Sequence, residues 1–222
     1  VSANTTAGFS IVSYTGNGTT NATVGHGLST PNVIWFKRRD TSNNWINYFS
    51  ELGTGHYLTL NKTDSADSAS GAWCTPSSST FQLNQVFSAT NTNTGTYIAY
   101  CFAEKQGYSK FGKYTGNGNA DGPFLYLGFK PAFFLVKNIT NAGYDWELRD
   151  NKRDSYNPVG YRLEANTSDA ESSYYAEYDF VSNGIKIKQN GNNYNTSGAS
   201  YIYIAFAESP FVNSNGVPNN AK

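Results

Sequence analysis

Ser13-Tyr14-Thr15-Gly16-Asn17-Gly18 is the stretch that decides the fold, because it returns almost unchanged as Lys113-Tyr114-Thr115-Gly116-Asn117-Gly118. A second pair of stretches, Tyr97–Glu104 and Tyr201–Glu208, follows in the same order, and both end in Phe-Ala-Glu. Two opening and two closing signatures in one order predict two copies of one structural unit. Because repeated positions mostly build the scaffold, we expect special chemistry where the copies differ.

The composition bounds the class of protein. With 222 residues, the chain is long enough for one large β domain or two small ones with a real core. The 16 basic and 16 acidic residues cancel, which gives nucleic acid and anionic lipid no charged face to bind. Charged residues make up only 14% and aromatic residues 16%, so Asn, Ser, Thr and Gly must keep the surface soluble. This pattern is typical of extracellular and virion β-proteins.

Hydrophobic alternation predicts strands throughout, with Gly16-Asn17-Gly18 as a tight turn and room for one helical turn near Ser65–Ala72. Both copies show roughly seven strands at the spacing of β-sandwiches. The expected strands of the first copy are Phe9–Tyr14, Val33–Lys37, Trp45–Phe49, Tyr57–Leu60, Thr80–Val86 and Gly95–Ala103. Those of the second are Phe111–Tyr114, Phe124–Leu127, Ala132–Lys137, Tyr144–Arg149, Tyr161–Glu164, Tyr174–Val181, Gly184–Gln189 and Ser200–Ala207.

The predicted fold class is therefore all-β, with two tandem, related, jelly-roll-like sandwich units from an internal duplication. We place the first unit at residues 9–108 and the second at residues 109–212. Residues 1–8 read as a linker from an upstream segment and residues 213–222 as a C-terminal tail. The start at Val1 and the absence of Met favour the ordered part of a longer polypeptide.

Cysteine and histidine usage predicts neither a metal site nor a cofactor. Cys101 aligns with Ala205, which favours a buried free thiol, and a disulfide between Cys101 and Cys74 is the alternative. Neither His26 nor His56 has zinc-like spacing from a cysteine. The glycine pairs are not followed by a helix that would bind phosphate. No apolar run or leader predicts membrane insertion.

Candidate binding residues lie where the two copies diverge, in Leu52–Ser79 and Asp150–Ser173. The repeated Trp45 and Trp146 are expected in the core. Trp73 has no match and sits in a loop, which makes it a candidate for an exposed platform that stacks on a sugar ring. Further candidates in the second loop are Tyr156, Tyr174 and Tyr175. Protein–protein contact is an equal alternative for all of these rings.

Paired carboxylates in polar loops complete the set of candidates. Asp150 and Asp154 could accept hydrogen bonds from a ligand, and Asp64 with Asp67 and Asp169 with Glu171 are further pairs. The loop Asp64–Asp67 could also hold calcium, although its spacing is not that of the helix-loop-helix calcium loop. A glycosidase needs such a pair across a cleft, but sequence neighbours in a loop meet that distance by accident. No Gly-x-Ser-x-Gly motif is present either. We therefore expect no catalytic residue.

Taken together, these motifs resemble a recurring module. The Tyr-Thr-Gly-Asn-Gly openings, the strands Pro31–Lys37 and Pro131–Lys137, the run Asp150–Asp154 and the two Phe-Ala-Glu closings are similar to the paired β repeat of large virion proteins of marine tailed bacteriophages. Those proteins are described as tail-fibre or concanavalin-like. The resemblance covers about Phe9 to Val212, without the upstream segments usual in such fibres, and it carries no binding or catalytic residue.

The resemblance implies a virion surface protein. We expect a non-enzymatic structural and adhesion module, outside the cell, that contacts host surface glycan or protein and forms homo-oligomers or binds other virion proteins. One alternative is a capsid or appendage decoration protein in which the aromatic residues serve only subunit contacts. Another is a polysaccharide-cleaving enzyme that uses Asp150 and Asp154.

Overall fold

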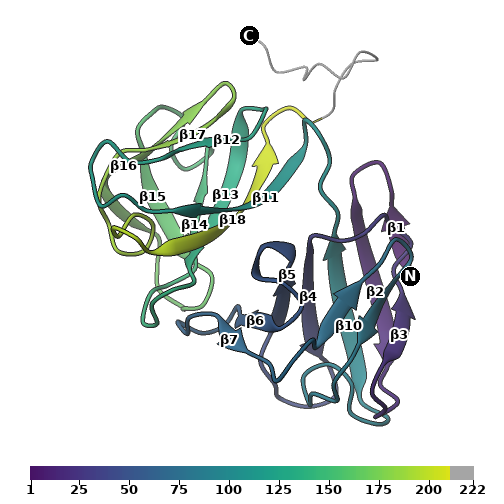
Figure 1. The fold of residues 1–222 in the computed structure, drawn as a ribbon. Coiled ribbons are helices and arrows are strands. Elements are labelled where there is room, and N and C mark those ends of the chain that lie inside the picture. Colours follow the sequence, from purple (N-terminus) through teal and green to yellow (C-terminus); the bar gives the residue numbers. More distant parts are fainter. Residues whose placement is uncertain (211–222) are drawn as a thin grey trace. The chain divides into compact units, whose positions relative to one another are not determined.

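The computed structural model describes residues 1–210, except for the side chains of residues 174–176, and it folds into two compact units (Figure 1). The first unit comprises Val1–Asn61 and Ala66–Glu104. The second comprises Lys62–Ser65 and the chain from Lys105 onward. The main boundary thus lies close to the predicted one at residues 108–109. The predicted tail at 213–222 and the last two residues of the predicted second unit lie outside the described residues.

The first unit contains two sheets whose inner faces share one core. The larger sheet has the strand order β1 (Ser2–Asn4), β2 (Phe9–Thr15), β10 (Thr96–Phe102), β4 (Val33–Arg38), β5 (Ile46–Phe49), β6 (His56–Thr59) and β7 (Asp67–Ser68). The smaller sheet has the order β3 (Ala22–Gly25), β9 (Thr80–Leu83) and β8 (Cys74–Pro76). Phe36 on β4 meets Phe81 on β9 edge to face, with ring centroids 5.2 Å apart. Facing sheets of this kind bury alternate side chains of each strand.

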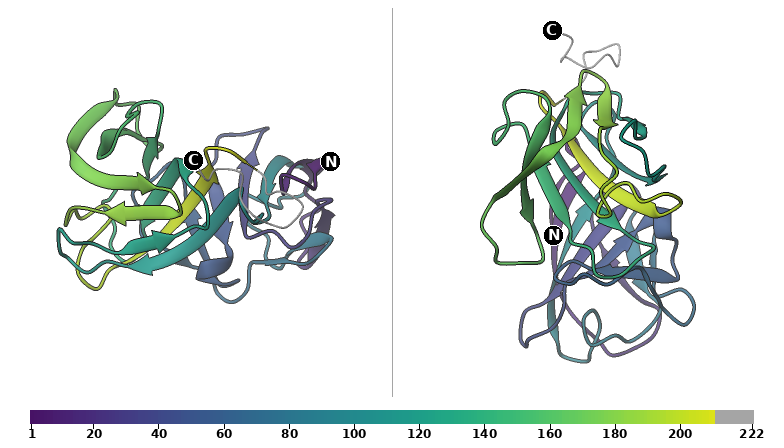
Figure 2. Two further views of the ribbon diagram at one scale, coloured as in Figure 1. Left: turned by 90° about the horizontal axis from the view of Figure 1, so that it is seen from above. Right: turned by 90° about the vertical axis from the view of Figure 1, so that its left-hand side faces the viewer.

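The second unit contains one eight-stranded sheet. Its order is β11 (Ser109–Thr115), β18 (Ser200–Ala207), β13 (Pro131–Asn138), β14 (Glu147–Asp150), β15 (Val159–Glu164), β16 (Ser172–Val181), β17 (Gly184–Ile187) and β12 (Phe124–Tyr126). The two edge strands, β11 and β12, follow each other directly in the chain. The sheet therefore curls around its own core, and Figure 2 shows this curvature in the green strands.

The predicted strands are all present, with ends that differ by a few residues, and the all-β class is confirmed. Four short strands were missed: β1, β3, β7 and β8. The linker predicted at residues 1–8 is wrong, because β1 pairs with β2 through Ala3 and Ser10. The helical turn expected near Ser65–Ala72 is also wrong, since Asp67–Ser68 is a strand and a 3₁₀ turn lies instead at Ser50–Leu52.

The repeated sequence motifs make the same hydrogen bonds in both units. In the first unit, the Tyr14 hydroxyl donates to Thr90 O at 2.8 Å, and the Asn17 N–H donates to Asn91 Oδ1 at 3.0 Å. In the second, the same bonds join Tyr114 to Tyr194 O at 2.7 Å and Asn117 N to Asn195 Oδ1 at 2.9 Å. Buried polar groups need such partners. The opening motif is therefore structural in both units.

The first glycine of the opening motif is required because a backbone carbonyl from another part of the unit lies close to its Cα. A Cβ on Gly16 would lie 2.3 Å from Thr92 O, and one on Gly116 would lie 2.3 Å from Thr196 O. Only glycine avoids these clashes. The motif is not the tight hairpin turn that we predicted, because β2 pairs with β10 and β1 while β3 pairs with β9. It leads the chain from one sheet to the other.

The two units differ in their number of sheets at the stretch that follows β7 in the first unit. In the first unit, Gly71 adopts a φ of +93° between β7 and β8, a conformation that other residues rarely adopt. The matching stretch of the second unit contains no glycine and forms one continuous strand, β16. Because β16 pairs with both β15 and β17, it joins what are two separate sheets in the first unit.

Both cysteines are buried free thiols, as we predicted in preference to a disulfide. Burial raises the pKa of Cys101 to about 12. A thiol that stays protonated is a poor nucleophile and a poor metal ligand, so Cys101 behaves as a small core residue.

Lys137 is a fully buried lysine in β13 whose ammonium group donates hydrogen bonds to two backbone carbonyls. Its Nζ donates to Tyr144 O at 2.7 Å and to Thr63 O at 3.2 Å. Burial lowers its pKa to about 8, although Asp145 and Asp64 oppose the shift. Removal of charge from water is costly, which explains this direction.

We expect the second unit to become more stable between about pH 8 and pH 10. In this window the unfolded chain keeps the Lys137 proton while the folded chain releases it, so the free energy of unfolding rises with pH, by about 2 kcal/mol. Above pH 10 it should fall again, because burial raises the pKa values of Tyr114 and Tyr178. Urea denaturation followed by Trp146 fluorescence measures this profile. A Lys137→Met variant should lose the rise, while Lys37→Met should keep it; a flat wild-type profile contradicts the expectation.

Candidate functional site

The two units differ in charge at a set of buried and partly buried positions that the strand pairing places in equivalent locations. Tyr57 pairs with Asp67 just as Arg162 pairs with Ser172. Asn84 N donates to Trp73 O at 2.9 Å, just as Lys188 N donates to Glu177 O at 2.8 Å. The first unit has apolar or aromatic side chains at these positions and the second has charged ones. The matching pairs are Ile46 with Glu147, Tyr48 with Arg149, Tyr57 with Arg162, and Trp73 with Glu177.

The charged members form an ionic cluster, which we define as Glu147, Arg149, Arg162 and Glu177. Arg149 Nη2 contacts Glu147 Oε2 at 3.2 Å and forms a closer ion pair with Glu177. Arg162 binds Glu147 through Nη1, and its Nη2 lies 2.9 Å from Glu164 Oε1. The side chains of Glu147 and Arg149 are 0% exposed, so solvent does not reach this part of the cluster.

Burying the charges of the ionic cluster costs free energy, which the ion pairs offset only in part. Burial raises the pKa of Glu147, although Arg149 opposes the shift. Among the described residues, Nε and Nη1 of Arg149 have no hydrogen-bond acceptor. Its guanidinium carbon lies 5.4 Å from the centre of the Tyr178 ring, a cation–π contact. Because buried ion pairs are seldom more stable than apolar packing, the cluster is better explained by the geometry that it imposes on β14, β15 and β16.

The loop that these strands support is residues 151–158, which we call the pocket loop. Asp150, the last residue of β14, precedes this loop. Its Oδ1 accepts hydrogen bonds from the backbone N–H groups of Lys152 and Arg153, both at 2.9 Å. Arg153 in turn bridges Asp150 and Glu171. Asp154 Oδ2 accepts from Gly160 N and Tyr161 N, both at 2.7 Å. Both carboxylates therefore shape the loop.

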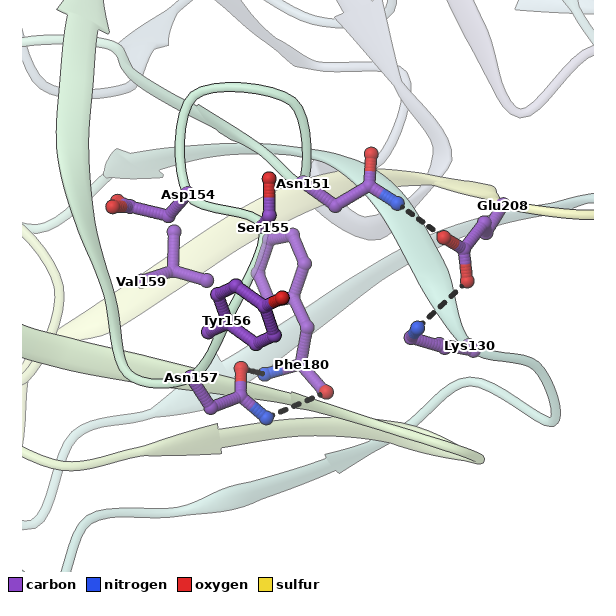
Figure 3. A pocket seen from close by; sticks show the side chains of 9 residues that line it. All are labelled: Lys130, Asn151, Asp154, Ser155, Tyr156, Asn157, Val159, Phe180 and Glu208. Carbon is purple, nitrogen blue, oxygen red and sulfur yellow. Dashed lines mark hydrogen bonds and ion pairs between the residues drawn. The ribbon is translucent and has the colours of Figure 1, made fainter. Parts of the chain in front are cut away.

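The pocket loop borders an open hollow of about 80 Å³ (Figure 3). Two side-chain amides are held in fixed orientations around it. Asn157 Nδ2 donates to Phe180 O at 2.9 Å and its Oδ1 accepts from Phe180 N at 2.8 Å. Asn151 Nδ2 donates to Glu208 Oε1 at 2.8 Å. The lining residues are Lys130, Asn151, Asp154, Ser155, Tyr156, Asn157, Val159, Phe180 and Glu208.

One aromatic ring stands at the rim of this hollow. Tyr156 is 87% exposed and lies among the lining side chains in Figure 3, beside Asn157 and Phe180. Glu208 Oε2 forms an ion pair with Lys130 Nζ at 2.8 Å, which balances the charge of the pocket wall. The site thus combines an exposed ring with amides, a hydroxyl, a carboxylate and an ammonium group. It can accept and donate hydrogen bonds and stack on a flat apolar face.

Comparison with protein families returned one match. The model of a domain of unknown function, DUF7483, covers residues 1–210. The chain belongs to the DUF7483 family. The match spans both compact units of this DUF7483 domain. No curated protein and no solved structure matched the chain.

The pocket of the DUF7483 domain contains two of the six residues that sequence reasoning proposed for binding. Tyr156 and Asp154 line it, and Asp150 anchors the adjoining turn. The exposed platform predicted at Trp73 is wrong: this residue is 1% exposed and its Nε1 donates to His56 O at 2.8 Å. Its ring is packed among aromatic neighbours of the first core: Phe36, Tyr48, Tyr57 and Phe87. Tyr174 and Tyr175 lie in β16, but their side chains are outside the described residues.

The sequence reasoning missed most of the polar wall. Asn151 and Asn157 lay inside the predicted divergent loop but were not singled out in a chain so rich in Asn. Glu208 could have been singled out from the sequence, since it ends the repeated Phe-Ala-Glu motif. No sequence pattern marked its ion-pair partner Lys130. Among the described residues, no group of three His, Cys, Asp or Glu side chains could hold a metal ion. No helix in that part of the chain is long and apolar enough to cross a membrane.

Proposed function

We propose that this DUF7483 domain is a non-enzymatic adhesion module that binds surface glycan at the pocket beside Tyr156. The observation that carries the proposal is the 87% exposure of the Tyr156 ring next to oriented amides. A single exposed ring is common on protein surfaces, but this ring stands beside two side-chain amides that are held in fixed orientations. Stacking on a sugar face would bury the ring while its polar neighbours bind hydroxyl groups.

The size of the pocket supports a weak contact with one sugar unit. A hollow of about 80 Å³ is far smaller than the 300–1,000 Å³ or so of sites that enclose a drug-sized ligand. The ligand would therefore lie on the surface with one edge inserted. Several copies that act together would give the affinity that one copy lacks.

The roles of the two aspartates favour binding without catalysis. Asp150 and Asp154 are occupied by backbone N–H groups of their own loop. A glycosidase instead needs two carboxyl groups directed at one bond, one of them free to transfer a proton. The carboxylates of the ionic cluster, Glu147 and Glu177, are buried and offer no access for a polysaccharide.

We also propose that the two units arose by duplication of one β-sandwich-type unit and that the protein lies on a virion surface. The duplication is supported by equivalent hydrogen bonds within each unit. Tyr14 and Tyr114 donate to equivalent carbonyls, and Asn91 and Asn195 accept from equivalent backbone N–H groups. The virion location rests on the sequence resemblance to the paired β repeat of bacteriophage surface proteins. Gold-labelled antibody on particles tests it, because a fibre protein marks the tail and a decoration protein marks the head.

Substitution of Tyr156 by alanine should weaken glycan binding at least tenfold, which corresponds to about 1.4 kcal/mol. The free energy of unfolding should stay within about 0.5 kcal/mol of wild type, because the ring is exposed. The measurement is binding of the labelled chain to an array of purified bacterial surface polysaccharides. Tyr126→Ala is the matched control, since Tyr126 is 66% exposed in the same unit but does not line the pocket. Equal binding by Tyr156→Ala and wild type, or no binding by either, rejects the proposal.

A further inference from the structure

A short segment from early in the chain forms part of the second compact unit. Lys62–Ser65 lies between β6 and β7 in the sequence but belongs to that unit. Its Thr63 carbonyl accepts two hydrogen bonds there, from Lys137 Nζ at 3.2 Å and from Gly143 N at 2.9 Å. Asp64 adds a favourable charge near the same ammonium group. With this segment in place, Lys137 is 0% exposed.

The second unit has its own version of this segment, between β15 and β16. Asn61 Oδ1 accepts from Trp45 N at 2.9 Å, and Asn166 Oδ1 accepts from Trp146 N at 2.7 Å. Strand pairing fixes the other end, where Asp67 and Ser172 hold equivalent places. Thr63 and Asp64 therefore correspond to Ser168 and Asp169. The sequences agree, with Asn61-Lys62-Thr63-Asp64-Ser65 matching Asn166-Thr167-Ser168-Asp169-Ala170.

This second segment is left uncovered. Ser168 and Asp169 are exposed, whereas Thr63 and Asp64 are only partly so. We call Asn166–Ala170 the docking segment. In the described residues it makes no contact with a lysine like the one that Thr63 makes.

The first unit has a counterpart of Lys137, and in the described part of the chain this lysine lacks the second hydrogen-bond acceptor that Thr63 provides to Lys137. Lys37 holds the place of Lys137, since it lies opposite Ile98 as Lys137 lies opposite Ile202. Its Nζ donates to Asn43 O at 2.7 Å, just as that of Lys137 donates to Tyr144 O. The described residues provide no second acceptor comparable to Thr63 O, and Lys37 remains partly exposed. We call Lys37 with the turn at residues 40–43 the lysine site.

We propose that the docking segment of one copy binds the lysine site of a second copy of this chain. The Ser168 carbonyl would accept from Lys37 Nζ, and Asp169 would face the same ammonium group, as Thr63 and Asp64 do for Lys137. The partner is a second copy because this chain carries both halves of the contact. Such a contact joins two different surfaces, and the smallest ring that it can close is a dimer in which each copy gives its docking segment to the other. It forms a ring or a head-to-tail filament.

Charge exchange tests the pairing. The full-length chain is examined by sedimentation equilibrium over a range of concentrations, as wild type and as Asp169→Lys and Lys37→Glu variants. Wild type should associate, and each variant should associate at least tenfold more weakly, because it places like charges together. An equimolar mixture of the two variants should associate again, since each then offers the charge that the other needs. Lys113→Glu, an exposed change of the same sign in β11, is the control and should behave as wild type.

The result that overturns the proposal is equally definite. A wild-type chain that stays monomeric contradicts it. So does association that the two variants leave unchanged, or two folded variants that fail to associate when mixed. Circular dichroism of each variant shows that it is folded, and Asp169 lies in an exposed loop where the substitution leaves the core intact.

Discussion

Replacement of Arg149 by methionine is expected to lower the free energy of unfolding of the second unit by about 3–5 kcal/mol. The arginine is 0% exposed and lies between Glu147 and Glu177. Without it, two carboxylates share a buried space with only Arg162 to balance Glu147. Urea denaturation followed by Trp146 fluorescence measures the effect, since Trp146 lies in this unit and is 1% exposed. The other tryptophans belong to the first unit: Trp35, Trp45 and Trp73.

The matched control removes the three most buried charges of the ionic cluster. In a Glu147→Leu, Arg149→Met, Glu177→Leu variant no buried carboxylate is left without a partner, and Arg162 keeps Glu164. Stability should recover to within about 1 kcal/mol of wild type or exceed it, because apolar side chains of similar volume replace a buried ion pair at little cost. If the single substitution costs less than about 1 kcal/mol, or if the triple variant is the less stable of the two, the cluster does not have the role described.

Trp73→Ala is expected to destabilise the first unit by about 3–5 kcal/mol, the usual cost of removing a large buried aromatic side chain. The ring packs against Phe36 at 5.8 Å, Tyr57 at 6.0 Å and Phe87 at 5.9 Å between ring centroids. Its loss also leaves the His56 carbonyl without its donor. Urea denaturation followed by circular dichroism measures the change. Trp45→Ala, at a partly exposed site, is the control and should cost less.

The same variant separates the core role of Trp73 from the sugar-stacking role first predicted for it. Because the proposed glycan pocket lies in the second unit, Trp73→Ala should leave glycan binding unchanged below the unfolding transition. Loss of binding in a variant whose stability is unaltered would mean that Trp73 does contact ligand.

The scaffold could be predicted from the sequence because it depends on local patterns. Strands such as Phe9–Thr15 and Thr96–Phe102 are rich in aromatic and β-branched residues, and their buried positions largely alternate. The repeated Tyr-Thr-Gly-Asn-Gly also marked matching places correctly. The motif was predicted as a hairpin turn, but its glycine is needed because Thr92 O approaches Gly16. The sequence does not reveal this contact, because the two residues are far apart in the chain. The short strands were missed because two to four residues are too few to show a hydrophobic periodicity.

The site was only partly predictable for the same reason. Tyr156 stood out as an unmatched aromatic residue in a polar loop, and that signal is local. Trp73 gave the same signal, but the partners that bury it come from strands that its sequence neighbours do not reveal. The ionic cluster was invisible, because Arg149 and Glu177 are 28 residues apart in the sequence and lie on strands that β15 separates in the sheet. Likewise, the match of Asn61–Ser65 with Asn166–Ala170 appeared only once strand pairing fixed the register.

The central claim is that the pocket beside Tyr156 is the binding site of this protein. It is tested most directly by NMR of the chain with labelled tyrosine rings, titrated with the polysaccharide that binds best on the array. A Tyr156→Phe variant assigns the resonance. We predict a saturable shift of the Tyr156 ring signal, with the tyrosines of the first unit unchanged. A Tyr156 signal that stays in place while the chain is saturated with polysaccharide would contradict the claim.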